Sequence, residues 1–516
     1  MTDLENQNTS QPNSKNAPLC ASLSENIKTL KNTLGNSNDI ILRELLIGKL
    51  RKQRIAIIHI DGLANETILN DSILESLTLH LTENPKIMSN EMNQYLKDYC
   101  LTVSDVKDIV DFTALYNALL NGDTIILFDG LTKGIAASTK SAKDRAISEP
   151  TTESVIRGPQ EAFTETLRTN TALIRRKIKS PNLWIKSRVI GQETQTDIAI
   201  MYINGIANDK IVQEVLDRLD RIEIDGILES NYIEEMIRDS KFSIFPTVYN
   251  SERPDVIAGE LLEGRIAILV DGTPFVLIVP ALFISFLQTA EDYYHNAIIS
   301  SFIRLIRFFG ISLSLVAPSL YVAITTFHQE MLPTPLLISI YSQREGVPFP
   351  AFVEALIMEI AFEILREAGI RMPRMIGPAV SIVGTLIVGQ AAVEAGIVSA
   401  VMVIIVALTA ICSFLFPAYG LSNAVRVLRF PLMILSGMFG LVGLMVGIML
   451  IILHLCSLRS FGVPYMSPFA PLIVKDQKDT LILLPRNLLL TRPRLISQKN
   501  NVRGKKHLGN TKRNVH

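Results

Sequence analysis

The sequence predicts an α/β soluble region made of tandem duplicated domains, followed by an α-helical polytopic membrane domain. Three observations support this fold class. Residues 376–458 contain only three formally charged side chains, Glu394, Arg426 and Arg429. A membrane-crossing helix needs about 20 mostly apolar residues, so this stretch has room for about three crossings. Residues 1–270 instead hold 38 acidic and 30 basic residues, as a water-soluble region does. That soluble region also contains an internal repeat.

The repeat consists of two pairs of matching segments. Residues 55–65 match residues 198–208, and residues 122–130 match residues 264–272 at nearly the same spacing. Each copy begins with a β-rich apolar run that ends in Asp-Gly or Asn-Gly and continues with a helical pattern. Each then ends in a second strand followed by Asp-Gly, a hairpin signal. Two matches with one spacing predict two copies of an α/β domain.

The N-terminal segment is polar, rich in Asn and Ser, and lacks the apolar core of a signal peptide. These features predict a disordered tail and a cytoplasmic soluble head. The whole chain is then expected to divide into a disordered polar tail (1–38), a first α/β domain (39–145), a linker with an Arg-Gly-Pro motif and a basic helix (146–185), a second α/β domain (186–280), a membrane domain (281–460) and a basic C-terminal tail (461–516).

Hydropathy predicts four membrane spans, over residues 308–327, 377–394, 397–416 and 430–455, and an amphipathic helix over 350–369 between the first two. Four spans bring the C-terminal tail to the same side as the head, and residues 459–516 have a net charge of +10. A basic tail is compatible with nucleic-acid binding, but beside a membrane span it favours a cytoplasmic anchor, so no nucleic-acid partner is expected. Arg426 and Arg429 fall on the opposite side and count against this topology.

Small residues recur along the last predicted span, at Gly437, Gly440, Gly443 and Gly447. Glycines at such spacing let two helices approach closely within a bilayer. The sequence leaves two interpretations open, packing within one chain and self-association of several chains.

The predicted amphipathic helix carries an acidic stripe. At 100° per residue, Glu359, Glu363, Arg366 and Glu367 share one sector of the helix. One interpretation is a helix on the membrane surface with solvated charges. The other is a stripe that faces an ion path and favours cations, because carboxylates within a membrane are costly and rings of them attract cations. Arg366 is spaced to pair with Glu363.

The linker motif Arg157-Gly158-Pro159 is predicted to fix the angle between the two domains and so to set subunit contacts, because Pro restricts φ and Gly permits unusual turns. A simply solvated linker helix is the alternative. Motifs for catalysis or cofactors do not appear: the seven histidines and four cysteines have no metal-ligand spacing, and no phosphate-binding glycine loop or serine elbow occurs. We therefore expect no enzyme and no cofactor.

The sequence resembles the GerA family, the A subunits of bacterial spore germinant receptors. The segments that carry the resemblance are Glu149–Pro159, Phe163–Glu165, Leu167–Asn170, Glu252–Asp255, Glu291–Tyr294, Glu345–Pro350, Arg366–Arg371, Gly389–Glu394 and Ser460–Tyr465. Ala162 departs from the pattern, which has Gly there.

The resemblance implies a complex in the spore inner membrane, with a transporter-like B-type subunit and a C-type lipoprotein subunit. It also implies that the complex senses nutrients and triggers release of monovalent cations, and that the A subunits form a homo-oligomer that conducts them. A paralogous branch accompanies release of dipicolinic acid and stays an alternative. A transporter-like sensor is a second alternative, although a transporter usually shows inverted repeats within its spans.

Overall fold

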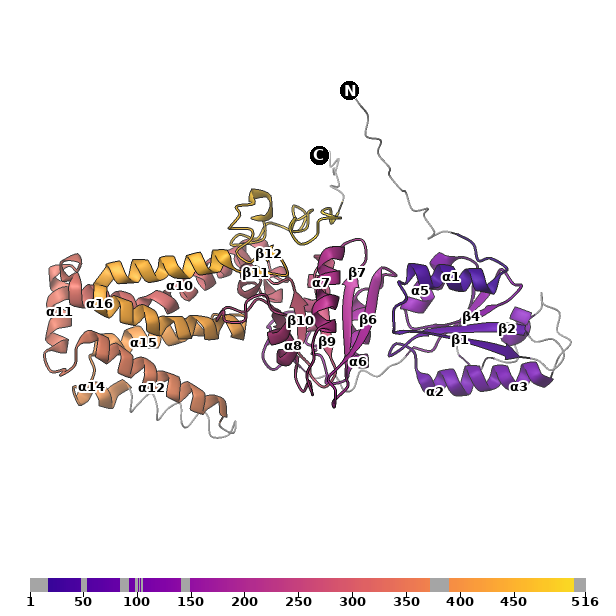
Figure 1. The fold of residues 1–516 in the computed structure, drawn as a ribbon, viewed down its shortest axis with the longest axis horizontal. Helices are drawn as coiled ribbons and strands as arrows, with labels where there is room; N and C mark the ends of the chain where they lie inside the picture. Colours follow the sequence, from indigo (N-terminus) through magenta and orange to yellow (C-terminus); the bar gives the residue numbers. More distant parts are fainter. Residues whose placement is uncertain are drawn as a thin grey trace, which may run out of the picture. The chain divides into compact units, whose positions relative to one another are not determined.

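The computed structural model describes residues 17–47, 53–83, 92–97, 101, 103, 105–140, 149–371 and 389–504 (Figure 1). The chain forms two compact units. The head unit contains Met1–Ile237, Asn250–Val279 and Arg492–Asn501, and the helical unit contains Arg238–Tyr249, Pro280–Thr491 and Val502–His516.

The first half of the head unit is a five-stranded antiparallel sheet in the order β1-β2-β4-β5-β3. Helices cover both faces of this sheet (Figure 1), because its central strands β2 and β4 are almost entirely apolar and buried. The strands are β1 (Ile40–Ile47), β2 (Gln53–Ile60), β3 (Val106–Ile109), β4 (Thr124–Phe128) and β5 (Gly134–Ala137). Helices α1 (Leu23–Thr33) and α5 (Phe112–Leu120) contribute to one core, and α2 (Glu66–Ile68), η2 (Leu69–Glu75), α3 (Ser76–Glu83) and α4 (Met92–Tyr95) lie in the same half of the head.

The second half repeats this strand order, β6-β7-β9-β10-β8. Its strands are β6 (Leu183–Ile190), β7 (Thr196–Ile203), β8 (Tyr249–Ser251), β9 (Ile266–Val270) and β10 (Val276–Val279). Helices α6 (Leu167–Lys177) and α9 (Pro254–Leu262) lie together against β7 and β9, and α7 (Asp209–Asp220) lies against α8 (Ser230–Ile237).

The two sheets share one hydrogen-bond pattern at the hairpin turn. The Asp129 carboxylate accepts a bond from the amide of Leu23 at the start of α1 (3.1 Å), and the Asp271 carboxylate accepts one from Leu167 at the start of α6 (2.9 Å). Gly130 and Gly272, which follow these aspartates, have positive φ angles of 84° and 88°. Only glycine adopts such angles readily, so the Asp-Gly pair both makes the turn and caps the helix.

These helices correct two predicted boundaries. α1 lies within the predicted tail 1–38, and its Leu23, Ile27 and Leu30 are buried in the first core, so the prediction of disorder is wrong for residues 23–33. Residues 1–16 lie outside the described part of the chain. α6 and the start of β6 lie within the predicted linker 146–185, so that segment is partly a packed element of the second half.

The C-terminal tail is also more ordered than predicted. Residues 492–501 belong to the head unit, where Arg492 Nε donates to the Leu262 carbonyl (2.7 Å) and Ser497 Oγ donates to that of Ile206 (2.9 Å). The predicted basic tail 461–516 therefore includes a stretch that packs in the head unit. Lys505, Lys506, Lys512 and Arg513 lie outside the described residues.

The helical unit contains four principal helices in its described residues, α10 (Ala297–Phe327), α12 (Ala351–Arg371), α15 (Ala400–Ser413) and α16 (Tyr419–Ser457). Of the described helices, α10 and α16 are long and apolar enough to cross a membrane. α12 confirms the helix expected over 350–369, and most of the expected span 377–394 falls on residues 372–388, outside the described chain. The shorter elements are η4 (Phe283–Leu287), η5 (Ala290–Tyr293), η6 (Gln329–Met331), α11 (Thr334–Arg344), α14 (Ala392–Glu394), β11 (Arg459–Ser460), β12 (Val463–Pro464) and η8 (Val474–Asp476).

α16 is a hairpin of two helical arms, residues 419–439 and 441–457. Gly440 between them has φ 60° and ψ −140°, which is not helical. A Cβ added at Gly443 would overlap the Leu435 carbonyl, and one at Gly447 would overlap the Leu432 side chain, so the second arm lies against the first. A straight helix would hold Leu432 and Gly447 about 22 Å apart. The prediction of one continuous span over 430–455 is therefore wrong.

Candidate functional site

The buried face of α12 carries carboxylates that meet arginines from α16. Arg429 Nη1 donates to Glu359 Oε2 at 2.6 Å, and the two side chains are 1% and 0% exposed. The pair lies beside a core cluster that contains Val322 of α10 and Met433 of α16. An ion pair this deep costs much desolvation free energy, which is offset only where further hydrogen bonds satisfy both partners.

A proline in α10 explains where Arg429 docks. Pro318 has no backbone N–H, so the carbonyl of Ser314, four residues earlier, lacks its helical partner. Arg429 Nε donates to that carbonyl (3.0 Å), and Arg429 Nη2 donates to Ser314 Oγ (2.9 Å). Arg429 therefore joins α10, α12 and α16.

A second ion pair follows one helical turn along α12. Arg426 Nε donates to Glu363 Oε1 (3.0 Å), and Arg426 Nη1 donates to Asn423 Oδ1 (3.0 Å). One turn further, Glu367 accepts from Arg371 of its own helix (2.7 Å) and its side chain is 57% exposed. The three glutamates thus run from a buried end to a solvent-exposed end.

Two buried carboxylates of α12 are only half satisfied. Glu354 Oε1 accepts from the amide of Ser399 (2.6 Å) and from its hydroxyl, and Arg344 Nε lies 3.6 Å from Glu354 Oε2. Within the described residues, Glu354 Oε2 and Glu359 Oε1 have no hydrogen-bond partner, although both side chains are fully buried. A buried carboxylate oxygen without a partner has a desolvation cost that no hydrogen bond from the described residues offsets.

The acidic stripe is present, but its surroundings differ from the expectation. Glu359 is fully buried and Glu363 is partly buried between helices, and Glu363 pairs with Arg426 and not with Arg366. Arg366 lies over the Phe414 ring, 6.0 Å from its centroid. Sequence reasoning missed Arg426 and Arg429 as partners. Their i, i+3 spacing, which matches the i, i+4 spacing of the glutamates, was the available signal.

The glycines of α16 pack within the chain in this structure. Gly437 faces Phe352 of α12, Gly440 faces Phe327 and His328 at the end of α10, and Gly443 and Gly447 face the first arm. These contacts are of the kind expected for packing within one chain.

The linker motif is held by the segment between β8 and α9. Gly158 has φ 144°, and the Pro159 carbonyl accepts from Arg253 Nη2 (3.0 Å), whereas Arg157 is exposed. Glu252 accepts bonds from the amides of Thr152 (2.6 Å) and Glu153 (3.1 Å). The turn at residues 157–159 is therefore anchored to the second half of the head.

Glu153 is the titratable group of this anchor with an unusual pKa. Burial raises the pKa of its carboxyl to about 7, while a hydrogen bond from Ser251 (2.6 Å) acts in the opposite direction. The Glu252 carboxylate adds a smaller upward effect on the pKa. Within the described residues, no group of three or more His, Cys, Asp or Glu is placed to hold a metal ion.

The family model described as "Bacillus/Clostridium GerA spore germination protein" matches residues 28–495. The chain belongs to the GerA spore germination protein family. It is 51% identical to spore germination protein KA of Bacillus subtilis (strain 168), covering 93% of this chain and 88% of that protein. It is 37% identical to spore germination protein GerLA of Bacillus cereus, covering 92% and 96%.

Among solved structures, the N-terminal domain of the A subunit of the Bacillus megaterium spore germinant receptor GerK3 is 41% identical. That comparison covers 52% of this chain and 98% of that domain, with a TM-score of 0.42.

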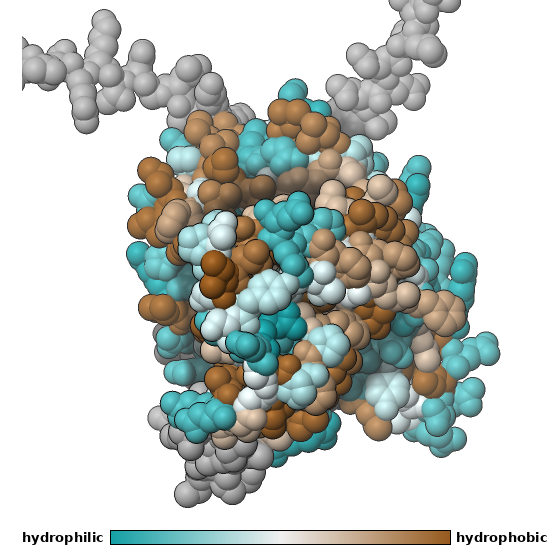
Figure 2. All heavy atoms as spheres, turned by 90° about the vertical axis from the view of Figure 1, so that its left-hand side faces the viewer, coloured by the Kyte–Doolittle hydropathy of each residue, from teal (hydrophilic) through white to brown (hydrophobic). Residues whose placement is uncertain are grey.

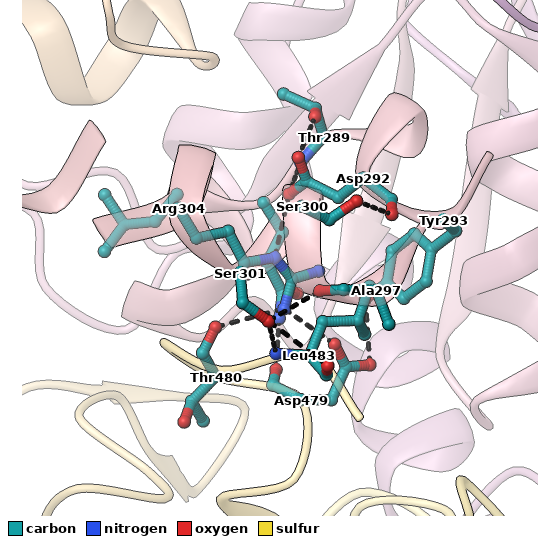
Figure 3. A network of polar contacts seen from close by, with 12 residues as sticks. Thr289, Asp292, Tyr293, Ala297, Ser300, Ser301, Arg304, Asp479, Thr480 and Leu483 are labelled. Atoms are coloured by element: carbon teal, nitrogen blue, oxygen red, sulfur yellow. Dashed lines mark hydrogen bonds and ion pairs between the residues drawn. The ribbon is translucent and has the colours of Figure 1, made fainter. Parts of the chain in front are cut away.

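In this GerA-family chain, a second buried charge cluster joins the two ends of the helical unit (Figure 3). Arg304 Nε donates to Asp292 Oδ2 (2.9 Å), and Arg304 Nη1 donates to Asp479 Oδ1 (2.8 Å). Arg307 Nη1 also donates to Asp292 (3.1 Å). We call Asp292, Arg304, Arg307 and Asp479 the clasp. It ties the segment before α10 to the segment after α16.

The clasp holds its two carboxylates differently. Burial works against ionisation of Asp292, but the hydrogen bonds and charges of Arg307 and Arg304 bring its pKa below the usual value. For Asp479 burial prevails over the attraction of Arg304, so its pKa is raised. The cluster therefore keeps Asp292 ionised and makes Asp479 the easier of the two to protonate.

The end of the GerA helical unit that carries α11 is mixed in polarity. A band of polar side chains crosses this face between apolar areas (Figure 2). Ile340 is the one buried residue of α11, and a depression of about 680 Å³ is lined there by Leu337, Ile338, Tyr341, Ser342, Arg344 and Glu345.

Proposed function

We propose that the protein is the A subunit of a nutrient germinant receptor in the spore inner membrane. It would act with a transporter-like B-type subunit and a C-type lipoprotein subunit. The proposal is supported by membership of the GerA family and by 51% identity to spore germination protein KA over 93% of this chain. The repeated strand order and the shared turn geometry of the head also support descent of its two halves from one duplicated domain.

In this proposal the helical unit is a multi-pass membrane body and the head is cytoplasmic. The chain enters and leaves this unit at one place: Ser460 Oγ accepts from the Ala281 amide (2.9 Å), and the Tyr465 carbonyl accepts from the Phe283 amide (2.9 Å). Two ends held together in this way support an even number of crossings. The hairpin of α16 supplies two of them.

We further propose that the membrane body oligomerises and that α12 lines its cation path. The observation that carries this proposal is Glu359 Oε1, a fully buried carboxylate oxygen without a partner among the described residues. Such an oxygen attracts a cation, and Arg429 neutralises the same carboxylate in the state seen here. Displacement of Arg429 would then uncover a negative charge in the path.

The test is germination of spores that carry Glu359→Gln together with Glu363→Gln. We expect slower release of monovalent cations after nutrient addition at an unchanged protein level. Glu367→Gln is the matched control, because Glu367 lies on the same helix but is exposed and paired locally with Arg371. Normal ion release by the double variant would remove α12 from the cation path.

A further inference from the structure

The segment Arg238–Tyr249 lies across the open end of the α16 hairpin. Ser243 Oγ is 3.0 Å from Nε2 of His454, near the end of the second arm, and the Phe245 ring lies 6.0 Å from the His454 ring. A Cβ added at Gly420, in the first turn of the first arm, would lie 3.4 Å from Pro246. Because both arms end here, the segment marks one end of the hairpin. We call it the hairpin-end loop.

Side chains alternate in direction along this loop. Ser243 and Phe245 are buried against the hairpin, whereas Phe242 is 99% exposed and Ile244 is 48% exposed. Lys241, next to Phe242, is also exposed. A fully exposed phenylalanine next to a serine that is buried against the hairpin is unusual for a surface that faces only water.

The length of the hairpin arms places this loop at the level of a bilayer face. The first arm, residues 419–439, is about 30 Å long at 1.5 Å per residue, which matches the apolar thickness of a bilayer. Apolar side chains of the second arm are exposed along its length, including Met445, Leu450 and Leu453. Phe414 and Tyr419, which flank the start of the first arm, are 73% and 61% exposed.

We propose that the hairpin-end loop is an interfacial membrane anchor. Phe242 and Ile244 insert at the boundary between lipid head groups and acyl chains, and Lys241 contacts lipid phosphates. Aromatic residues with an adjacent basic side chain favour this boundary. With Phe414 and Tyr419, the loop forms an apolar belt at the end of the hairpin. The inference rests on the proposed membrane body and adds a lipid contact made by a segment that does not span the membrane.

A lipid surface fits this loop better than a protein partner. The exposed side chains of the loop lie at the end of a candidate span, and the exposed charge beside Phe242 is basic, which complements anionic head groups. A protein partner or a second copy of the chain would shield these residues from lipid, and the experiment below detects that outcome.

The experiment is fluorescence quenching by lipids brominated at shallow or deep acyl positions. Trp184 is the only tryptophan of the chain, so Trp184→Phe gives a silent background for Phe242→Trp in the full-length protein in anionic vesicles. An interfacial residue lies about 5–10 Å into the boundary, so we expect about twofold stronger quenching by shallow than by deep bromines. If Trp184→Phe impairs folding, the difference between chains with and without Phe242→Trp, both retaining Trp184, gives the same measurement.

Two further tryptophan positions distinguish failure of the membrane anchor from failure of the proposed membrane body. Leu450→Trp, on the exposed face of the second arm, should be quenched most by deep bromines, and Val189→Trp, exposed on β6 in the head, should not be quenched. Quenching at position 450 but not at 242 overturns the anchor and leaves the membrane body intact. Absence of quenching at 450 overturns the membrane body itself. Lys241→Glu should weaken shallow quenching at 242 in anionic but not in neutral vesicles.

Discussion

One buried arginine–carboxylate pair in the head unit and one in the helical unit are satisfied to different degrees. In the head, Arg175 Nε and Nη2 donate to both oxygens of Asp39 (2.8 and 3.0 Å), and Arg175 Nη1 donates to the Leu183 carbonyl (2.7 Å). In the helical unit, Arg429 reaches one oxygen of Glu359, and the other oxygen has no partner within the described residues.

The difference separates a structural ion pair from a changeable one. Asp39 and Arg175 join the two halves of the head, and every alternative arrangement would lose a bidentate contact. Glu359 already has an unsatisfied oxygen, so moving Arg429 costs less there. We therefore expect the head to respond as one body and the α12–α16 contact to be the place where the helical unit rearranges.

The largest effect is expected from breaking the satisfied pair. Asp39→Ala leaves Arg175 buried and unpaired, which should lower the free energy of unfolding of the head by about 3–5 kcal/mol. Trp184 lies in the head and its Nε1 donates to the Thr33 carbonyl, so its emission during denaturant unfolding reports this loss. The double variant Asp39→Leu with Arg175→Met should recover most of the stability. An unaffected Asp39→Ala would mean that the pair does not join the two halves.

A smaller and functional effect is expected at the half-satisfied pair. Arg429→Gln removes the positive charge beside Glu359 and should raise cation leak from unstimulated spores. The charge-assisted hydrogen bond that is lost contributes about 1–3 kcal/mol to the free energy of unfolding. Potassium release before nutrient addition is the measurement. Arg371→Gln, at an exposed pair on α12, is the control. If spores with Arg429→Gln release no more potassium before nutrient addition than wild-type spores do, the Arg429–Glu359 pair does not close the cation path.

A substitution in the linker turn tests whether the arrangement of the head depends on backbone geometry as well as on ion pairs. Gly158 has φ 144°, so Gly158→Val should strain the turn by about 1–3 kcal/mol and disturb the Pro159–Arg253 contact. We expect less assembled protein and a weaker nutrient response. Arg157→Ala, at an exposed side chain, should do neither. Normal accumulation and response of Gly158→Val would show that the turn does not set subunit contacts.

The smallest effect concerns pH. The folded-state pKa of Glu153 is about 7 against an ordinary value of 4.5, so its stabilisation is fully present below pH 4.5 and is lost as the pH rises through 7. Glu153→Gln should reduce the fall in the free energy of unfolding between these pH values by on the order of 1 kcal/mol, a discounted figure because Glu153 keeps some solvent contact. Trp184 emission at several pH values measures the slope. An unchanged slope would assign it to other groups.

Much of the head follows from its sequence. The apolar runs at β2, β4, β7 and β9 and the Asp-Gly turns predict the central strands, because period and turn chemistry are local. α1 was missed, and α6 was predicted as a basic linker helix and not as part of the second domain, because the matched segments begin only at β2 and β7. The carboxylates Asp129 and Asp271, more than 100 residues away in sequence, cap these two helices. Local patterns do not report such distant capping.

In the helical unit, periodicity predicted the acidic face of α12 but not what covers it. Arg429 docks where Pro318 frees a carbonyl, which depends on three helices meeting. The turn at Gly440 is invisible to hydropathy, since the sequence stays apolar through it. Its position is set by the contacts of Gly440 with Phe327 and His328, which are tertiary.

In the proposed membrane body, the tight turn at Gly440 also bears on how the chain would enter the bilayer during synthesis. With a single glycine between the arms, no polar loop has to be carried across the apolar layer. Both arms can enter together as a preformed helical hairpin, with Gly443 and Gly447 already packed against the first arm. Arg426 and Arg429 lie in the second and third turns of that arm, so the two charges of the hairpin need to move only part of the way into the bilayer.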